Sequence, residues 1–133
     1  MQRSSELTSV VESIYNALST GDADTVAGLL TTGDGLTFIG TDPTEWYTDR
    51  ESVLTLVRSQ SGAGVKVRAG DIQAFEEGTI GWVADKGTFI LPDGTEVPFR
   101  LTAVFRQEDG GWRMVQEHAS IAVDNEEVIG TEL

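Results

Sequence analysis

Apolar residues recur at helical spacing in the first half of the chain. A stripe between residues 5 and 19 predicts a helix that buries a single face, and it consists of Leu7, Val10, Val11, Ile14, Tyr15 and Leu18. Gly21 is typical of a helix end, and Asp22 is typical of the N-cap of a second helix over residues 23–30. Thr48-Asp49-Arg50-Glu51 has the pattern of a capping box and predicts that a third helix begins there.

The pattern changes to that of strands after Ser61-Gly62. Alternating apolar and polar positions predict strands over residues 64–76, 79–91, 95–107 and 111–123. The segments between them have hairpin-turn sequences, namely Glu77-Gly78, Asp93-Gly94 and Asp109-Gly110-Gly111. A shorter strand is expected over residues 36–40, before the third helix. The second half of the chain is therefore predicted to be an antiparallel meander.

The predicted strands are long for a small domain. At about 3.3 Å per residue, they would extend over more than about 30 Å, and such strands should bend. Gly70, Gly81 and Gly87 lie inside them, where bends and bulges are least costly. A strongly curved sheet wrapped around the first helix closes the core most simply. The predicted fold class is therefore α+β, with N-terminal helices packed on a curved antiparallel meander sheet.

The charge of the chain excludes some classes of partner. The formal net charge is −13, from 22 acidic and 9 basic residues. Such a surface repels phosphate groups, so neither nucleic acid nor an anionic membrane is an expected partner. Arg3 stands apart from the other basic residues, all of which lie between Arg50 and Arg113. The strand half of the chain therefore retains the means to form a local positive patch.

The length and composition are typical of one domain, expected over residues 1–133. The chain has no cysteine, which excludes disulfides and thiolate metal sites. The polar N-terminus does not resemble a signal peptide, and no apolar run is long enough to span a membrane. The expected location is the cytoplasm. The acidic tail over residues 124–133 is expected to fray.

The order and spacing of several short segments resemble a known family. These segments are Tyr15-Asn16-Ala17-Leu18 before Gly21-Asp22, Leu36 to Asp42, Trp46, Asp49-Arg50-Glu51, Gly111-Trp112-Arg113 and Glu117-His118-Ala119-Ser120. Together they resemble the SnoaL-like domain of the nuclear transport factor 2-like superfamily, over nearly the whole chain. The resemblance implies a cone-shaped α+β barrel with a pocket between the first helix and the sheet. It also implies homodimers that form through the outer face of the sheet, where Val104, Val115 and Ile121 are candidate contacts.

The only histidine of the chain, His118, is the first candidate for chemistry. Strict alternation along the last strand predicts one face made of Trp112, Met114, Gln116, His118 and Ser120. On this face, His118 would lie in the pocket as a proton donor or acceptor. The alternative is a structural histidine, or one at a dimer interface. No metal ion or other cofactor is expected, because one histidine without cysteines or an acidic cluster is a poor metal site.

Tyr15 and Asp42 are the other catalytic candidates. The superfamily resemblance implies a tyrosine on the first helix as an oxyanion donor and two aspartates on strands, as in ketosteroid isomerases. The aspartate positions fall near Gly40 and Phe99, so neither is acidic here. Asp42 lies two residues beyond the first of them and is a substitute. This departure argues against steroid isomerisation, and Tyr15 has an alternative as a core residue.

Aromatic and neighbouring side chains are the candidate walls of the pocket. The residues expected to bind the ligand are Phe38, Trp46, Trp112, Met114 and Ser120. Trp46 lies in an expected lid loop over residues 41–48. Ordinary core packing is the alternative for the aromatic residues, and it is favoured for Trp82. Of Asp71, Asp85 and Arg100, which lie within strands, two are expected to face solvent, whereas any that faces the interior must be paired.

Three functions remain open from the sequence. The first is a SnoaL-like protein that binds a small, largely apolar molecule in the cone. The second is an enzyme that transfers protons through His118, Tyr15 and Asp42, as an isomerase, cyclase, dehydratase or hydrolase. The third is a dimerisation or association module. The resemblance does not choose between them, because one fold supports many functions.

Overall fold

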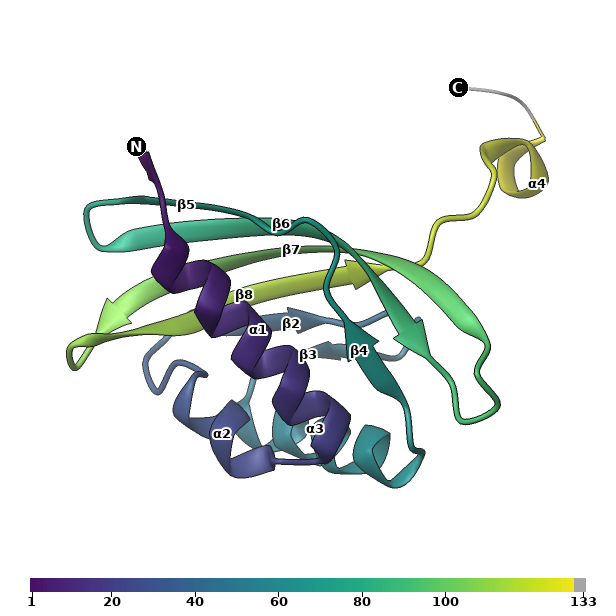
Figure 1. Ribbon diagram of the computed structural model, residues 1–133, viewed down its shortest axis with the longest axis horizontal. Helices are drawn as coiled ribbons and strands as arrows, with labels where there is room; N and C mark the ends of the chain where they lie inside the picture. Colours follow the sequence, from purple (N-terminus) through teal and green to yellow (C-terminus); the bar gives the residue numbers. More distant parts are fainter. Residues whose placement is uncertain (131–133) are drawn as a thin grey trace.

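The computed structural model describes residues 1–130 (Figure 1). Its helices are α1 (Ser5–Thr20), α2 (Ala23–Gly28), α3 (Arg50–Gly62) and α4 (Asn125–Ile129). Its first four strands are β1 (Gln2–Arg3), β2 (Thr37–Ile39), β3 (Trp46–Tyr47) and β4 (Lys66–Arg68). The remaining strands are β5 (Gln73–Glu77), β6 (Ile80–Ile90), β7 (Glu96–Glu108) and β8 (Gly111–Ser120).

The helices begin where the sequence predicts them, and side chains cap their first turns. Ser4 accepts a hydrogen bond from the backbone N–H of Leu7, at 3.1 Å, at the start of α1. Asp22 caps α2 as expected. Asp49, rather than Thr48, caps α3 and accepts from the N–H of Ser52 at 2.9 Å. Each cap satisfies a backbone donor that would otherwise lack a partner at the first turn.

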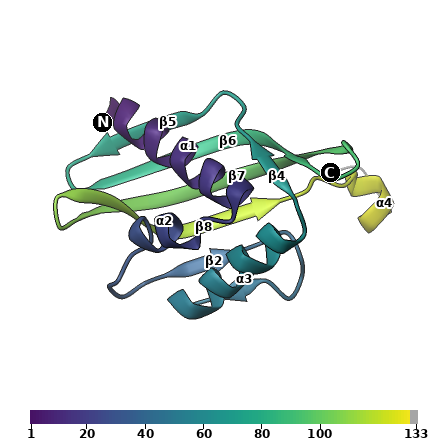
Figure 2. The same cartoon turned by 60° about the horizontal axis from the view of Figure 1, so that its bottom comes forward.

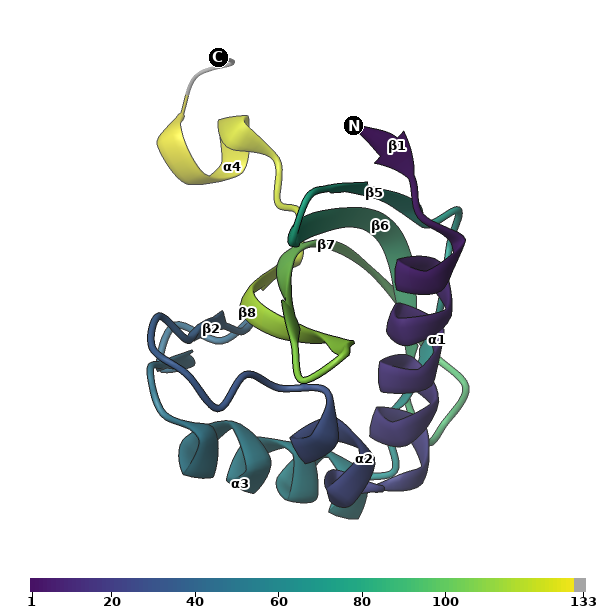
Figure 3. The same ribbon diagram turned by 90° about the vertical axis from the view of Figure 1, so that its left-hand side faces the viewer.

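The sheet has the strand order β1-β5-β6-β7-β8-β2-β3, and β4 pairs with β6. Strands β5 to β8 form the predicted antiparallel meander, whereas β2 joins β8 in parallel. The sheet is therefore mixed, curled and not closed. Figure 3 shows it curving around an interior that α1 bounds on one side and α2 and α3 bound on another. The predicted α+β fold is confirmed.

The first predicted strand of the meander is divided into two. Strands β4 and β5 are separate, and Gly70 lies between them. A Cβ atom at Gly70 would lie only 1.9 Å from the carbonyl oxygen of Lys86, so the backbones approach more closely there than a side chain permits. The N–H of Gly70 donates to the carboxylate of Asp85 at 3.2 Å instead of to a neighbouring strand. This close approach lies where the chain turns from β4, which packs against α1, into β5.

The core lies between α1 and the concave face of the sheet, and Figure 2 shows α1 lying across that face. The side chains most fully removed from solvent there are Leu7, Leu30, Val53 and Phe105. A second, smaller cluster joins the helices to one another through Ala17, Val26, Leu54 and Val57. Packing of α1 into the concave face therefore organises the whole domain.

The end of the chain leaves the domain after β8. Helix α4 projects away from the sheet in Figure 1, and its residues are exposed. The acidic sequence predicts a frayed tail here, whereas residues 125–129 form a short helix. Residues 131–133, the last of that expected tail, lie outside the described residues.

Candidate functional site

A cavity lies between α1, α3 and the concave face of the sheet. It has a volume of about 50 Å³, and an adjoining compartment of about 40 Å³ shares several of its walls. The shared wall residues are Tyr15, Leu18, Phe38, Val57, Leu101 and Glu117. Spaces of this size hold a few water molecules or a small chemical group. The lining is mostly apolar, so the polar groups in it stand out.

Glu117 on β8 is the most unusual of these groups. Its side chain is 7% exposed, and its Oε2 atom has no hydrogen-bond partner within residues 1–130. Burial, and secondarily the charge of Glu45, raises the pKa of Glu117 from its ordinary 4.5 to about 8. The carboxyl is therefore neutral at pH 7 and able to donate as well as accept a hydrogen bond. An unpartnered buried carboxyl is costly for the fold and marks a candidate functional group.

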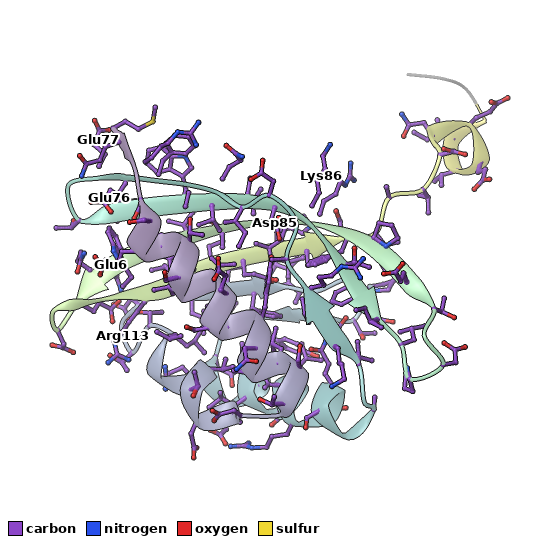
Figure 4. The ribbon with its side chains drawn as sticks, in the orientation of Figure 1. Glu6, Glu76, Glu77, Asp85, Lys86 and Arg113 are labelled. Carbon is purple, nitrogen blue, oxygen red and sulfur yellow. The ribbon has the colours of Figure 1, made fainter. Side chains whose placement is uncertain are left out.

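Tyr15 also lines the cavity, but its hydroxyl is hydrogen-bonded outside the group of Glu117 and its neighbours. It donates to the carboxylate of Asp85 on β6 at 2.9 Å. Burial and the neighbouring Asp85 charge raise the pKa of Tyr15 well above its usual value. Figure 4 shows Asp85 and Lys86 on opposite sides of β6, with Asp85 directed toward α1. Asp85 thus links α1 to the sheet and is the buried, paired charge of the three that the sequence places in strands, whereas Asp71 and Arg100 are exposed.

The cavity is adjacent to a depression at the surface. This depression has a volume of about 200 Å³ and shares Thr41, Gln60 and Phe89 with the cavity. Its other walls are apolar side chains from four segments, namely Val65, Leu91, Val97 and Ile121. The shared residues show that this depression, called the mouth below, adjoins the cavity.

His118 does not face the cavity, so the prediction of its orientation is wrong. Its side chain is exposed, whereas its neighbours Glu117 and Ala119 are buried. The reason is a β-bulge: Val104 of β7 pairs with Gln116, and Phe105 pairs with Met114, which leaves Val115 as an extra residue in β8. An extra residue inverts the alternation beyond it. Trp112 and Met114 therefore share the inner face with Glu117 and Ala119 instead of with His118 and Ser120.

The predicted site residues divide into two separate groups. Asp42, Trp46, His118 and Ser120 line an outer depression of about 260 Å³ to which Tyr15 does not contribute. Trp46 there is 65% exposed. Asp42 accepts hydrogen bonds from the backbone N–H and the hydroxyl of Thr44, which hold its pKa below the usual value and tie it into a turn. The structure therefore does not bring His118 and Asp42 together with Tyr15.

The remaining predicted residues line the interior or belong to the core. Phe38 lines the cavity and its adjoining compartment, and Met114 lines the compartment. Trp112 is buried in the core, and its Nε1–H has no hydrogen-bond partner within residues 1–130. In the described part of the chain, no three histidine or acidic side chains are grouped as a metal-ion site.

Sequence reasoning missed Glu117, although a local signal exists. The second half of β8 alternates polar Gln116, His118 and Ser120 with Glu117 and Ala119. Counted from Ala119 backward, this alternation places residue 117 on the apolar face. Counted forward from Trp112, it places residue 118 there. A single strand offers no means of choosing, because the bulge is set by contacts with other parts of the fold.

Comparisons with known proteins identify the family. The sequence profile of the SnoaL-like domain matches residues 7–124, so the chain belongs to the SnoaL-like domain family. Solved structures with the nuclear transport factor 2-like fold resemble it closely. A protein of this type and of unknown function from Pseudomonas putida KT2440 has a TM-score of 0.80 at 15% identity, over 92% of this chain and 89% of that one.

Two further structures show the same fold. A candidate dehydratase from Streptomyces avermitilis has a TM-score of 0.79 at 18% identity, over 89% of this chain and 95% of that one. A candidate calcium/calmodulin-dependent protein kinase II association domain from Xanthomonas campestris has a TM-score of 0.75 at 20% identity, over 92% of this chain and 95% of that one. No curated protein matches the sequence. Within residues 1–130, no helix is long and apolar enough to cross a membrane.

Proposed function

We propose that this protein binds a small, largely apolar molecule in the cavity between α1 and the sheet, with Glu117 as its polar anchor. One observation carries the proposal. The carboxyl of Glu117 is buried among apolar walls, and its Oε2 atom lacks a hydrogen-bond partner within residues 1–130. A ligand with one polar group would satisfy that atom and cover apolar surface. The mouth provides room for a ligand longer than the cavity.

A cavity-filling variant tests this proposal. Six-carbon probes with different polar ends (1-hexanol, n-hexylamine, hexanoate and cyclohexanone) are titrated into the protein while backbone amide shifts are followed by NMR. We expect at least one probe to shift amides of α1 and β8. Ala119→Leu, which fills the cavity from its β8 wall, should abolish those shifts. His118→Leu adds a leucine at the adjacent exposed position and should preserve them. Equal responses in both variants, or none in the native protein, would refute the proposal.

Proton transfer is the second candidate function, and Glu117 favours it in place of His118 and Asp42. A carboxyl whose pKa lies near 8 changes its charge close to neutral pH, as a general acid or base requires. Deuterium exchange next to the carbonyl of cyclohexanone in D₂O is a direct assay. A catalytic Glu117 predicts that Glu117→Gln slows the exchange by about 10²- to 10⁴-fold. Exchange at the buffer rate with the native protein would leave binding as the function.

The convex face of the sheet favours self-association in addition. Phe75, Trp82 and Val104 lie side by side across β5, β6 and β7, and each is only half-buried. The rings of Phe75 and Trp82 stack with centroids 6.3 Å apart. We propose that a second copy of the chain covers this row. The fold shared with an association domain supports the proposal.

A further inference from the structure

The walls of the cavity contain acidic side chains and, in the part of the chain that the structure describes, no basic ones. Glu45 and Glu117 both line it, and the lining within residues 1–130 includes no lysine, arginine or histidine. The Oε1 atom of Glu45 accepts the backbone N–H of Asp42 at 2.8 Å, which holds this carboxylate at the edge of the cavity. An anionic ligand would therefore meet repulsion from Glu45, and from Glu117 as well once that carboxyl is ionised.

Aromatic rings form much of the remaining wall. Tyr15, Phe38, Phe89 and Phe99 all line the cavity. Phe99 is at the centre, with its ring centroid 4.5 Å from that of Phe89 and 5.9 Å from that of Tyr15. It lies over Gly87, where a Cβ atom would come within 2.3 Å of the ring. The faces of such rings attract organic cations, an effect that increases where water is excluded.

We propose that the ligand is a small organic cation, an amine with an apolar body, whose ammonium group pairs with the carboxylate of Glu117. This inference rests on the proposed binding function and names the class of ligand. The unpartnered Oε2 atom supplies the acceptor, and Glu45 and the aromatic rings of the lining add attraction for positive charge. A neutral ligand that accepts a hydrogen bond from Glu117 would gain nothing from the charge of Glu45 or from the aromatic rings. The small cavity accommodates the ammonium head, and the apolar body extends to the mouth.

The proposal gives binding a definite dependence on pH. The titratable side chains that face Glu117 across the cavity are Tyr15 on α1 and Glu45 before β3. Without ligand, Glu117 holds a proton up to about pH 8. An ammonium ion favours the ionised carboxylate, so the amine must displace this proton when it binds at lower pH. Amine affinity should consequently rise about tenfold per pH unit up to pH 8. It should then level off until the amine itself loses its proton near pH 10, as a lysine does.

Three probes of equal length test the inference. Isothermal titration calorimetry compares n-hexylamine, 1-hexanol and hexanoate at pH 8.5, and repeats n-hexylamine at pH 6.5 in two buffers of different ionisation enthalpy. We expect n-hexylamine to bind most tightly and hexanoate most weakly. At pH 6.5 the affinity of n-hexylamine should fall at least tenfold, and the buffer dependence should show the release of close to one proton.

Matched variants distinguish the cavity from the acidic surface, which attracts amines weakly everywhere. Glu117→Gln keeps the size of the side chain and should lower n-hexylamine affinity by about tenfold or more at pH 8.5, with little change for 1-hexanol. His118→Gln introduces the same amide at the adjacent exposed position, and should change neither the n-hexylamine affinity nor the 1-hexanol affinity. Glu45→Gln removes the charge that helps raise the Glu117 pKa, and should move the pH profile of binding to lower pH. Circular dichroism confirms that each variant is folded.

The outcomes separate this inference from the function on which it rests. If 1-hexanol or hexanoate binds more tightly than n-hexylamine, and Ala119→Leu abolishes that binding, the ligand is not a cation. The proposed binding function then still stands. Equal n-hexylamine affinity in native protein and Glu117→Gln overturns the inference as well, because the amine then binds elsewhere. If Ala119→Leu changes the binding of none of the probes, both the amine inference and the proposed binding function are wrong.

Discussion

At the scale of the residue, two buried carboxyl groups stand out in the apolar interior of this domain. Glu117 and Asp85 are both buried, yet their surroundings differ. Asp85 accepts from the Tyr15 hydroxyl and from the Gly70 N–H, so its charge is compensated. Glu117 has the charge of Glu45 nearby and no compensating donor at Oε2 within residues 1–130. The Asp85 carboxylate is therefore satisfied by hydrogen bonds, whereas Glu117 reduces the stability of the fold whenever it ionises.

The raised pKa of Glu117 predicts how stability changes with pH. An acid whose pKa is higher in the folded state holds its proton more tightly there, so unfolding releases the proton between about pH 4.5 and pH 8. The contribution of Glu117 to the free energy of unfolding should fall through this window, by at most about 1.4 kcal/mol per pH unit. In Glu117→Gln this contribution disappears, so the variant should be more stable than the native protein at pH 8. Urea unfolding across the window measures both.

Glu12→Gln is the control for that experiment, because it removes an exposed carboxyl on α1. Its stability should follow the native pH profile. If Glu117→Gln has the same pH dependence as the native protein, the carboxyl of Glu117 is ionised throughout the window and the description of its environment is wrong.

The bond between Tyr15 and Asp85 predicts a second effect at this scale. Tyr15→Phe keeps the ring against Phe99 and removes only the hydroxyl that Asp85 accepts from. One acceptor interaction of a buried carboxylate is lost, so the free energy of unfolding should fall by about 1–3 kcal/mol. Tyr47→Phe removes a hydroxyl elsewhere in the sheet and is a control of the same chemistry. A loss no larger than that of the control would show that water replaces the hydroxyl.

At the scale of the element, side chains from one segment complete the hydrogen bonds of another. The guanidinium of Arg50 at the start of α3 donates to the carbonyl oxygens of Ala27, Leu30 and Thr31, at 3.1, 2.7 and 2.9 Å. These carbonyls lie at and just beyond the end of α2, where helical partners run out. Arg50 therefore ties α3 to α2, and a positive charge at a helix C-terminus is favourable in addition.

Replacing Arg50 tests this link. Arg50→Met keeps most of the aliphatic chain but removes the guanidinium donor from the three carbonyls, and should lower the free energy of unfolding by about 1.5–3 kcal/mol. Arg50→Lys should recover only part of the loss, because an ammonium group lacks the planar fork of the guanidinium. Arg58→Met, at an exposed position of the same helix, should change the free energy of unfolding by less than about 0.5 kcal/mol. Thermal and urea unfolding of the three variants give the comparison.

At the scale of the whole molecule, the curled sheet has two faces with different roles. Its concave face holds α1 and the cavity, and its convex face presents the row of Phe75, Trp82 and Val104. Arg3 adds to this row, with its guanidinium 5.3 Å from the centre of the Phe75 ring. A row of half-buried apolar side chains on the outer face of a sheet is typical of an association surface.

The convex face therefore predicts a dimer that one charge disrupts. Sedimentation at tens of micromolar should give twice the mass of the chain for the native protein. Val104→Glu should give the mass of a single chain, since an unpaired carboxylate would be buried in the interface. Thr55→Glu, at an exposed position of α3, should remain dimeric. A native protein that sediments as a monomer would remove the convex face as an association surface.

Local patterns in the sequence account for most of the elements. The apolar stripe of α1, the residues Gly21-Asp22 between the first two helices and the hairpin turns of the meander all act over a few residues, and the structure confirms them. The short strands β1 and β3 were not predicted, because two residues carry no recognisable period. The break at Gly70 was anticipated only as a bend, since it depends on the backbone of β6 lying close by.

The sequence by itself determined the helices, the meander and the family to which the chain belongs, because periodicity, capping and turn residues are local properties. Only the tertiary structure decided which face of β8 lines the cavity. Leu29 and Thr31 hydrogen-bond with Met114 in the first half of the strand, at 2.7 and 2.9 Å, and β2 pairs with residues 116–118 in the second half. Val115 is the extra residue between these two pairings. An alternating pattern defines two faces of a strand but does not say which of them is buried. The bulge therefore places Glu117, rather than the expected His118, inside the cavity.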